Sequence, residues 1–229
     1  MNIDKKNIIV TGASRGIGFE LVRQLSAQGH DVLAISRNSK PVQEFSTKIR
    51  CLSADIGTAA GIESIASYIK KNWTRVDVVV HNAGKLIHKP FVETTMDDFE
   101  AVYRVNVFGV AALTQIILPY LIPGSHIVAI SSMGGIQGSM KFAGLAAYSS
   151  SKGALITLME LLAEEFKETG ASFNTLALGA VQTEMLAEAF PGYQAPVTAE
   201  DMATYIGTFA LTGQKLYNGK VLQVSSSTP

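Results

Sequence analysis

The stretch Thr11-Gly12-Ala13-Ser14-Arg15-Gly16-Ile17-Gly18 joins a short apolar run, 7–11, to a segment with helical periodicity, 16–28. Its glycines allow a tight turn in which the backbone comes close to a phosphate group. The start of the following helix offers unpaired N–H groups and a partial positive charge to the same anion. Glycines also simply break strands, but the position between a strand and an amphipathic helix favours a phosphate-binding turn.

Six further apolar runs follow this unit along the chain, and we expect each of them to form a strand. The runs are 31–36, 49–52, 76–80, 126–131, 172–178 and 220–224, and helix-length segments at 59–71, 96–120 and 147–169 lie between most of them. Runs that are apolar without strict alternation are typical of parallel strands covered on both faces. The alternation predicts an α/β fold: one doubly wound domain over residues 1–229, with about seven parallel strands and helices on both faces.

Composition excludes several classes of protein. Hydrophobic residues make up 47% and charged residues 17% of the 229 residues, which excludes an intrinsically disordered chain. The 19 Lys and Arg residues balance the 19 Asp and Glu residues and form no basic block, which argues against a nucleic-acid partner. A single cysteine, Cys51, cannot form an intrachain disulfide, in keeping with a reducing cytoplasm.

Two segments bear on localisation. The first six residues run straight into the first strand, so we expect no export signal and a cytoplasmic protein. The apolar segment 105–122 only just reaches the length of a membrane span, and it contains Asn106 and Pro119. We expect it to be a helix buried in the core or in a subunit interface, with no membrane partner.

The glycine spacing, Gly-x-x-x-Gly-x-Gly, resembles that of the short-chain dehydrogenase/reductase family, whose turn commonly reads Thr-Gly-x-x-x-Gly-x-Gly. The resemblance continues in His81-Asn82-Ala83-Gly84, Asn106, Ser132, Tyr148-Ser-Ser-Ser-Lys152 and Gly179-Ala-Val-Gln-Thr183, and it extends from residue 7 to about residue 183. It implies a Rossmann-type fold, a nicotinamide dinucleotide as cofactor, and a homodimer or homotetramer.

Three features depart from the family pattern. His81 stands where the family commonly has a first Asn, and Leu178 stands where it has a Pro. The second change puts in doubt the course of the loop beside the nicotinamide. The separation of 16 residues between Ser132 and Tyr148 exceeds the commonest family spacing, so we expect an insertion within 137–144 that reshapes the rim of the site.

The residues after the second strand indicate which nicotinamide dinucleotide binds. A carboxylate there would accept from the ribose 2′-hydroxyl of NAD, whereas Ser36-Arg37 offers a cation to the 2′-phosphate of NADP. Arg15 matches the arginine of NADP-preferring family members and could reach the same group, although both arginines could also be solvated surface residues. We expect NADP(H). Asp55 resembles the adenine-contacting Asp of the family, or it caps the start of a helix.

The resemblance carries the expected dinucleotide contacts onto seventeen positions. They are Gly12, Ser14, Arg15, Gly16, Ile17, Gly18, Arg37, Asp55, Ile56, Asn82, Ala83, Gly84, Tyr148, Lys152, Gly179, Val181 and Thr183.

The expected catalytic residues are Asn106, Ser132, Tyr148 and Lys152. Tyr148 and Lys152 are four residues apart on a predicted helix and share one face. A nearby ammonium favours the phenolate, so we expect Lys152 to lower the pKa of Tyr148. Ser132, with Ser131 as its competitor, would hold the substrate carbonyl. Asn106 lies in an apolar helix, where its amide either holds a kink or supports a proton path through a water.

These residues predict an NADPH-dependent reductase of a ketone or aldehyde, with Tyr148 as general acid and base. The histidines show no ligand spacing, so we expect no metal. A 3-oxoacyl-acyl-carrier-protein reductase is the alternative within the class, and it would need a basic patch, for which Lys85, Lys89 and Arg104 are scattered candidates. From another class, the chain could be a non-catalytic dinucleotide sensor. The short segment 184–198 predicts a compact cleft for small or flexible substrates.

Overall fold

The computed structural model of the chain describes residues 4–225. Residues 1–3 belong to the start of the chain, on which we base the expected absence of an export signal, and they lie outside the described residues.

A seven-stranded parallel sheet forms the centre of the molecule, in the order β3-β2-β1-β4-β5-β6-β9. Its strands are β1 (Asn7–Thr11), β2 (Asp31–Ser36), β3 (Arg50–Ser53), β4 (Val76–His81), β5 (Leu121–Ser132), β6 (Ser172–Leu178) and β9 (Val221–Val224). The predicted parallel sheet is confirmed. Because the strand order reverses between β1 and β4, the crevice for a ligand opens beyond the carboxyl ends of these two strands.

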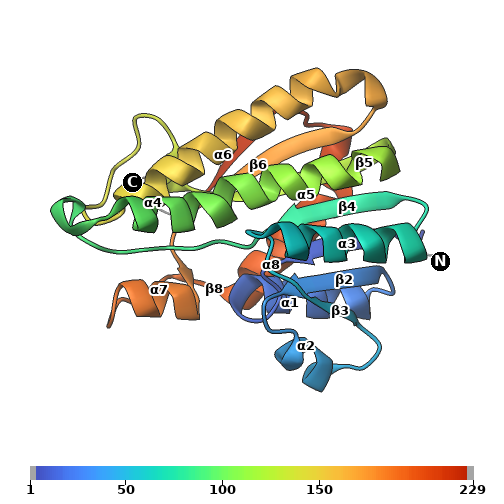
Figure 1. Cartoon of the computed structure of the whole chain (residues 1–229), viewed down its shortest axis with the longest axis horizontal. Coiled ribbons are helices and arrows are strands. Elements are labelled where there is room, and N and C mark those ends of the chain that lie inside the picture. The colour runs from blue at the N-terminus through green and yellow to red at the C-terminus, as the bar shows by residue number, and fades with distance from the viewer. Residues whose placement is uncertain (1–3, 226–229) are drawn as a thin grey trace.

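Helices cover both faces of the sheet. They are α1 (Gly16–Ala27), α2 (Lys40–Phe45), α3 (Ala59–Asn72), α4 (Met96–Tyr103), α5 (Gly109–Ile117), α6 (Ala146–Glu165), α7 (Glu184–Ala189) and α8 (Ala199–Thr212). A small second sheet pairs β7 (Val181–Gln182) with β8 (Val197–Thr198). Figure 1 shows α3, α5 and α6 on one face of the large sheet.

The alternation of side chains in β1 explains why there are two cores. Ile8 and Val10 pack on one face with α1 and α8, whereas Ile9 packs on the other face with α3, α5 and α6. All three side chains are fully buried. Neighbouring residues of a strand point to opposite faces, so a strand covered on both sides must be apolar throughout, as the sequence is.

The segment 96–120, expected as one helix, is interrupted by a π-helical turn at Arg104–Phe108 between α4 and α5. By length and composition alone, Met96–Tyr120 could cross a membrane, and 39% of its apolar window is buried inside the fold. Val110, Leu113 and Ile117 lie in the core against the sheet. The segment is therefore a covering helix of the sheet, as expected for a core helix.

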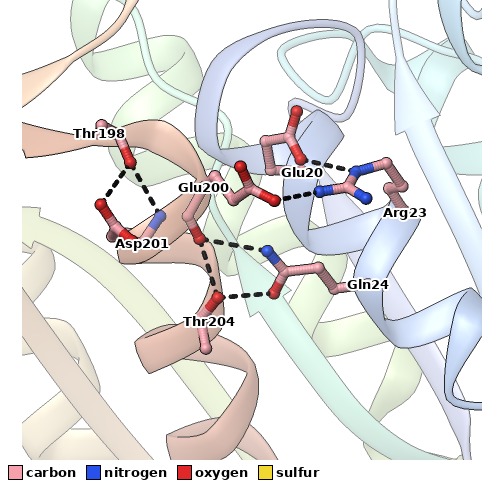
Figure 2. Close-up of polar contacts among 7 residues, drawn as sticks. All are labelled: Glu20, Arg23, Gln24, Thr198, Glu200, Asp201 and Thr204. Carbon is pink, nitrogen blue, oxygen red and sulfur yellow. Dashed lines mark hydrogen bonds and ion pairs between the residues drawn. The ribbon is translucent and has the colours of Figure 1, made fainter.

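Helix α8 docks onto α1 through polar contacts, which Figure 2 shows. Arg23 donates to the carboxylate of Glu200 at 2.7 Å, and Gln24 donates to the Glu200 carbonyl at 3.1 Å. Thr204 donates to the side-chain oxygen of Gln24 at 3.2 Å, and Thr198 caps the start of α8. These bonds hold the start of α8, and with it the end of the segment that connects α7 to α8, against α1.

Candidate active site

The phosphate turn adopts a conformation that requires glycine at three positions. Gly12 and Gly16 have φ of 69° and 55°, in the left-handed region that favours glycine. A Cβ at Gly18 would overlap the Gly12 carbonyl oxygen. No described side chain caps α1 at Arg15, so the first N–H groups of that helix are free to bind an anion. The turn therefore fits the phosphates of a dinucleotide.

The segment after β4 is hydrogen-bonded to the backbone and side chain of this turn. The Asn82 amide donates to the carbonyls of Thr11 at 3.0 Å and Gly12 at 3.2 Å, and the Ala83 N–H donates to the Thr11 hydroxyl at 3.0 Å. Asn82, expected as a dinucleotide contact, thus holds the backbone of the turn. Gly84 faces the site instead, since a Cβ there would lie 3.6 Å from the Lys152 Nζ.

A cavity of about 310 Å³ opens beside the end of β2. Its lining includes Arg37, Asp55, Lys85 and Arg104. Arg37 forms no hydrogen bond or ion pair within residues 4–225, so its guanidinium is available to a ligand. Asp55 accepts from the Gly57 N–H at 2.8 Å. The cavity is large enough for a nucleoside, with a free cation at its edge.

One interpretation near this cavity, Asp55 as a helix cap, is wrong. Thr58, and not Asp55, is the cap of α3, because its hydroxyl accepts from the Gly61 N–H at 3.1 Å. The Ile56 side chain is 5% exposed and packs in the core, so only its backbone could reach a dinucleotide.

Arg15, expected to reach the same phosphate as Arg37, is paired with α7 in this structure. Its guanidinium forms a two-bond fork with the Glu188 carboxylate of α7, in which the Nη2 to Oε2 distance is 3.1 Å. Arg15 lines a separate cavity of about 660 Å³, together with Ser14 and Gly16. The two arginines therefore line different cavities, and the expected contact of Arg15 with the 2′-phosphate stays a prediction.

The first turns of α6 place Tyr148 and Lys152 beside the end of β5. The Lys152 Nζ lies 5.7 Å from the centre of the Tyr148 ring. The Ser132 hydroxyl faces the Tyr148 hydroxyl, close enough to favour the phenolate. Ser131 donates to the Lys152 carbonyl at 2.9 Å and is 3% exposed, so it anchors α6 and cannot bind a substrate. The structure thus brings Tyr148 and Lys152 together with Ser132, and it favours Ser132 over Ser131.

Burial governs the protonation of this pair. It raises the pKa of Tyr148 to about 12, while the hydrogen bond from Ser132 acts in the opposite direction. Burial lowers the pKa of Lys152 to about 8. The expected lowering of the phenol pKa does not occur in the protein without its dinucleotide, because burial raises the pKa more than Ser132 lowers it. Tyr148 is therefore protonated at neutral pH, which is the form that a proton donor needs.

Asn106, the fourth predicted catalytic residue, is fully buried in the π-helical turn. Its amide accepts from the Lys85 N–H at 2.8 Å and donates to the Lys85 carbonyl at 3.0 Å. It also donates to Ser151 at 2.9 Å, and Ser151 donates to the Tyr148 carbonyl at 2.7 Å. Asn106 thus lies in the interruption of the long helix and ties the loop after β4 to the start of α6.

The remaining expected contacts follow β6. The Gly179 N–H donates to the Val224 carbonyl at 2.9 Å, and Val181 is buried in β7. Thr183 caps α7 by accepting from the Leu186 N–H at 3.3 Å, and its methyl group lies against Gly16. Thr183 thus reaches the phosphate turn, although its hydroxyl is engaged with the helix.

The sequence does not indicate that His88 contacts both the end of α7 and the loop before α6. Its Nδ1 and the Ala189 carbonyl are 2.8 Å apart, and its ring lies 4.7 Å from the Phe190 ring. Gly144, at the end of the predicted insertion, has φ of 83°, and a Cβ there would overlap the imidazole. Figure 1 shows α7 and the loop before α6 at the same end of the molecule as the start of α4. These contacts join residues far apart in the sequence, so no local pattern around His88 predicts them.

Within residues 4–225, no group of three or more His, Cys, Asp and Glu residues could hold a metal ion.

Comparisons with known proteins agree with this geometry. A family model described as short chain dehydrogenase matches residues 6–194. The chain is 27% identical over 211 residues to the 3-oxoacyl-acyl-carrier-protein reductase FabG of Escherichia coli K12, covering 90% of this chain and 86% of that protein. It is 28% identical to a short chain dehydrogenase from Shigella flexneri solved in complex with NADP, with a TM-score of 0.86 and 96% of both chains covered. A 4-hydroxyisoleucine dehydrogenase solved with NADH shares the fold, at 20% identity, a TM-score of 0.88, and coverage of 97% and 98%.

Proposed function

The chain belongs to the short-chain dehydrogenase family, and from this membership we propose that it is an NADP(H)-dependent reductase of ketones or aldehydes, reversible as an alcohol dehydrogenase. It is an oxidoreductase that uses a nicotinamide dinucleotide. The observation that carries the proposal is the grouping of Tyr148 with Lys152 and Ser132, in which the Lys152 Nζ lies 5.7 Å from the centre of the phenol ring.

Each group of the site has one task in this reaction. A nicotinamide dinucleotide held by the turn 11–18 would supply the hydride for the carbonyl carbon of the substrate. Tyr148 donates its proton to the carbonyl oxygen, which the Ser132 hydroxyl holds in place. The resulting phenolate is stabilised by the Lys152 ammonium. In the oxidation direction the same groups act in reverse, with Tyr148 as the base.

Reprotonation of Tyr148 needs a route to solvent. Lys152 is suited to pass a proton on, because burial brings its pKa to about 8, close to neutrality. Asn106 lies next to it, since both the Asn106 Oδ1 and the Lys152 Nζ lie within 4 Å of the Cβ position of Gly84. We propose that Asn106 holds a water that connects Lys152 to solvent.

The free guanidinium of Arg37 supports NADP(H) as the cofactor. A 2′-phosphate requires a cation, and the residues directly after β2, Arg37-Asn38-Ser39, contain no carboxylate. The remaining expected dinucleotide contacts belong to the same proposal.

We further propose a cytoplasmic enzyme whose residues 1–229 form one catalytic domain, without nucleic-acid or membrane partners. Three exposed apolar side chains on the α4–α6 side support a homodimer or homotetramer: Met96, Phe108 and Leu161 are 74%, 55% and 62% exposed. The attachment of α7 to His88 supports a compact cleft for small or flexible substrates.

The second candidate is a 3-oxoacyl-acyl-carrier-protein reductase, which the similarity to FabG supports. An acidic carrier protein would need a basic surface at the crevice. Two of the three basic candidates are paired with carboxylates, Lys89 with Asp98 at 2.9 Å and Arg104 with Glu100 at 3.6 Å. This pairing weakens the patch, so we rank the small-molecule reductase first.

A panel of ketones, aldehydes and a 3-oxoacyl thioester, followed by NADPH absorbance and repeated with NADH, tests the proposal. We expect Tyr148→Phe to lower kcat by about 10²- to 10⁴-fold, because it removes the proton donor, while NADPH binding persists. Tyr205→Phe, at a tyrosine on α8, serves as the control and should leave kcat unchanged. Full turnover by Tyr148→Phe, or oxidation of neither dinucleotide with any substrate, would refute the proposal. An unchanged cellular effect of Tyr148→Phe would point to the dinucleotide sensor.

A further inference from the structure

The fork between Arg15 and Glu188 joins the phosphate turn to the last turn of α7. Both guanidinium Nη atoms bond to the two carboxylate oxygens, which is the geometry that makes arginine–carboxylate pairs specific. The two side chains are 48% and 62% exposed, so solvent and ligands can reach the pair. A group that competes for the guanidinium can therefore open the fork.

Helix α7 presents a second carboxylate to the same turn. Glu184 lies one helical turn before Glu188, and its Oε2 is 3.3 Å from the position of a Cβ on Gly16. The cavity beside Arg15 is also lined by Glu20 and Glu44. The single Arg15 guanidinium is thus surrounded by carboxylates, and a phosphate gains attraction there only if Arg15 turns away from α7.

We propose that Glu188 is a cofactor-specificity residue, which holds the Arg15 guanidinium and competes for it with the 2′-phosphate of NADP(H). The inference rests on the proposed NADP(H) dependence and extends it to α7. Binding of a 2′-phosphate to Arg15 releases Glu188, and Glu188 in turn weakens the binding of the 2′-phosphate, since coupling between two ligands of one group is reciprocal.

Opening the fork would also loosen α7, which lies beside the substrate cleft. The last turn of α7 is held at two points, by Arg15 at Glu188 and by His88 at the Ala189 carbonyl. A dinucleotide with a 2′-phosphate loosens the first point, whereas one without it leaves both in place. The chain would therefore distinguish NADP(H) from NAD(H) partly through the cost of opening the fork.

Two adenosine ligands isolate this effect without the nicotinamide. We expect Glu188→Gln, measured by isothermal titration calorimetry, to tighten the binding of adenosine 2′,5′-bisphosphate by about two- to fivefold, the range for an exposed ion pair. The binding of adenosine 5′-monophosphate, which lacks the 2′-phosphate, should not change. Glu164→Gln is the matched control, because it removes the carboxylate of another exposed ion pair, that with Lys167 on the far end of α6.

A double-mutant cycle tests whether the effect passes through Arg15. In an Arg15→Gln background, Glu188→Gln should no longer tighten the bisphosphate, because there is no guanidinium to release. Equal tightening of both adenosine ligands, no tightening of either, or a gain that persists without Arg15 would overturn the role of Glu188. Failure of the unaltered protein to bind NADPH and NADH at all would instead overturn the proposed function on which the inference rests.

Discussion

Replacing the buried lysine of the site should change how the stability of the protein depends on pH. Lys152 is 3% exposed, and burial lowers its pKa from 10.5 to about 8. At 1.36 kcal/mol for each pKa unit, the buried ammonium costs about 3 kcal/mol relative to the neutral amine. Lys152→Met removes this cost and also removes the bond from Nζ to the Ile130 carbonyl at 2.7 Å.

The direction of the change of stability with pH follows from the pKa of Lys152 being lower in the folded chain than in the unfolded chain. Below pH 8 both the folded and the unfolded chain hold the Lys152 proton, so the full cost of burial is present. Between about pH 8 and 10.5 the folded chain loses the proton first, and its free energy of unfolding rises with pH by up to about 1.4 kcal/mol per unit. Lys152→Met has no such group. The free energy of unfolding of the variant minus that of the unaltered protein should therefore fall by about 2 kcal/mol between pH 7 and about pH 9.5.

Urea unfolding at the two pH values, followed by the fluorescence of the single tryptophan, measures this difference. Trp73 is 6% exposed in the folded protein, so its emission reports unfolding. The lost bond to Ile130 contributes equally at both pH values and cancels in the comparison. Lys70→Met, at an exposed lysine near the end of α3, is the control and should show no such trend. A difference for Lys152→Met that stays constant or grows with pH would refute the argument from burial.

Two further variants test the supports of the site. Gly144→Ala and Gly138→Ala carry similar backbone strain, with φ of 83° and 78°, but only the first meets a neighbour, the His88 ring. Gly144→Ala should therefore lose about 1–3 kcal/mol more stability than Gly138→Ala and have the lower melting temperature. Equal melting temperatures of the two variants would contradict the contact with His88. Asn106→Leu leaves the N–H and carbonyl of Lys85 without their side-chain partner, which should lower the urea-unfolding free energy by about 2–4 kcal/mol. A loss within about 0.5 kcal/mol would show that these groups find other partners.

The strands could be predicted from the sequence because their signal is local. Each is a short apolar run, and a sheet covered on both faces requires such runs without alternation. The main departure is β5, which begins at Leu121 rather than at residue 126 and includes Pro123 and Gly124, two poor strand formers. The pairing of Leu121 with Val76 extends the strand, and that contact between distant residues leaves no local pattern.

The helices beyond the large sheet were harder to predict. Helices α2 and α7 have six residues each, too few to show an amphipathic period. Helix α8 carried a readable start in Thr198 and Asp201, followed by Met202 and Ile206, which are buried.

At the site, motifs predicted which residues meet, but not their electrostatics. The sequence placed Tyr148, Lys152 and Ser132 together, and the structure does the same. The direction of the Tyr148 pKa depends on burial by segments far along the chain. The partner of Arg15 is likewise distant, because Glu188 lies 173 residues away in sequence. Contacts of this kind follow from the tertiary fold and carry no spacing rule.

The packing of α8 against α1 has a consequence for the order in which the chain can fold. Leu21 and Leu25 of α1 lie in the core with Ile206 of α8, and Gly207 allows α8 to approach Leu21 closely. During synthesis, α1 therefore keeps an apolar face exposed to water until α8 has left the ribosome. A fragment that ends at residue 194, where the family match ends, would leave this apolar face of α1 exposed and should aggregate.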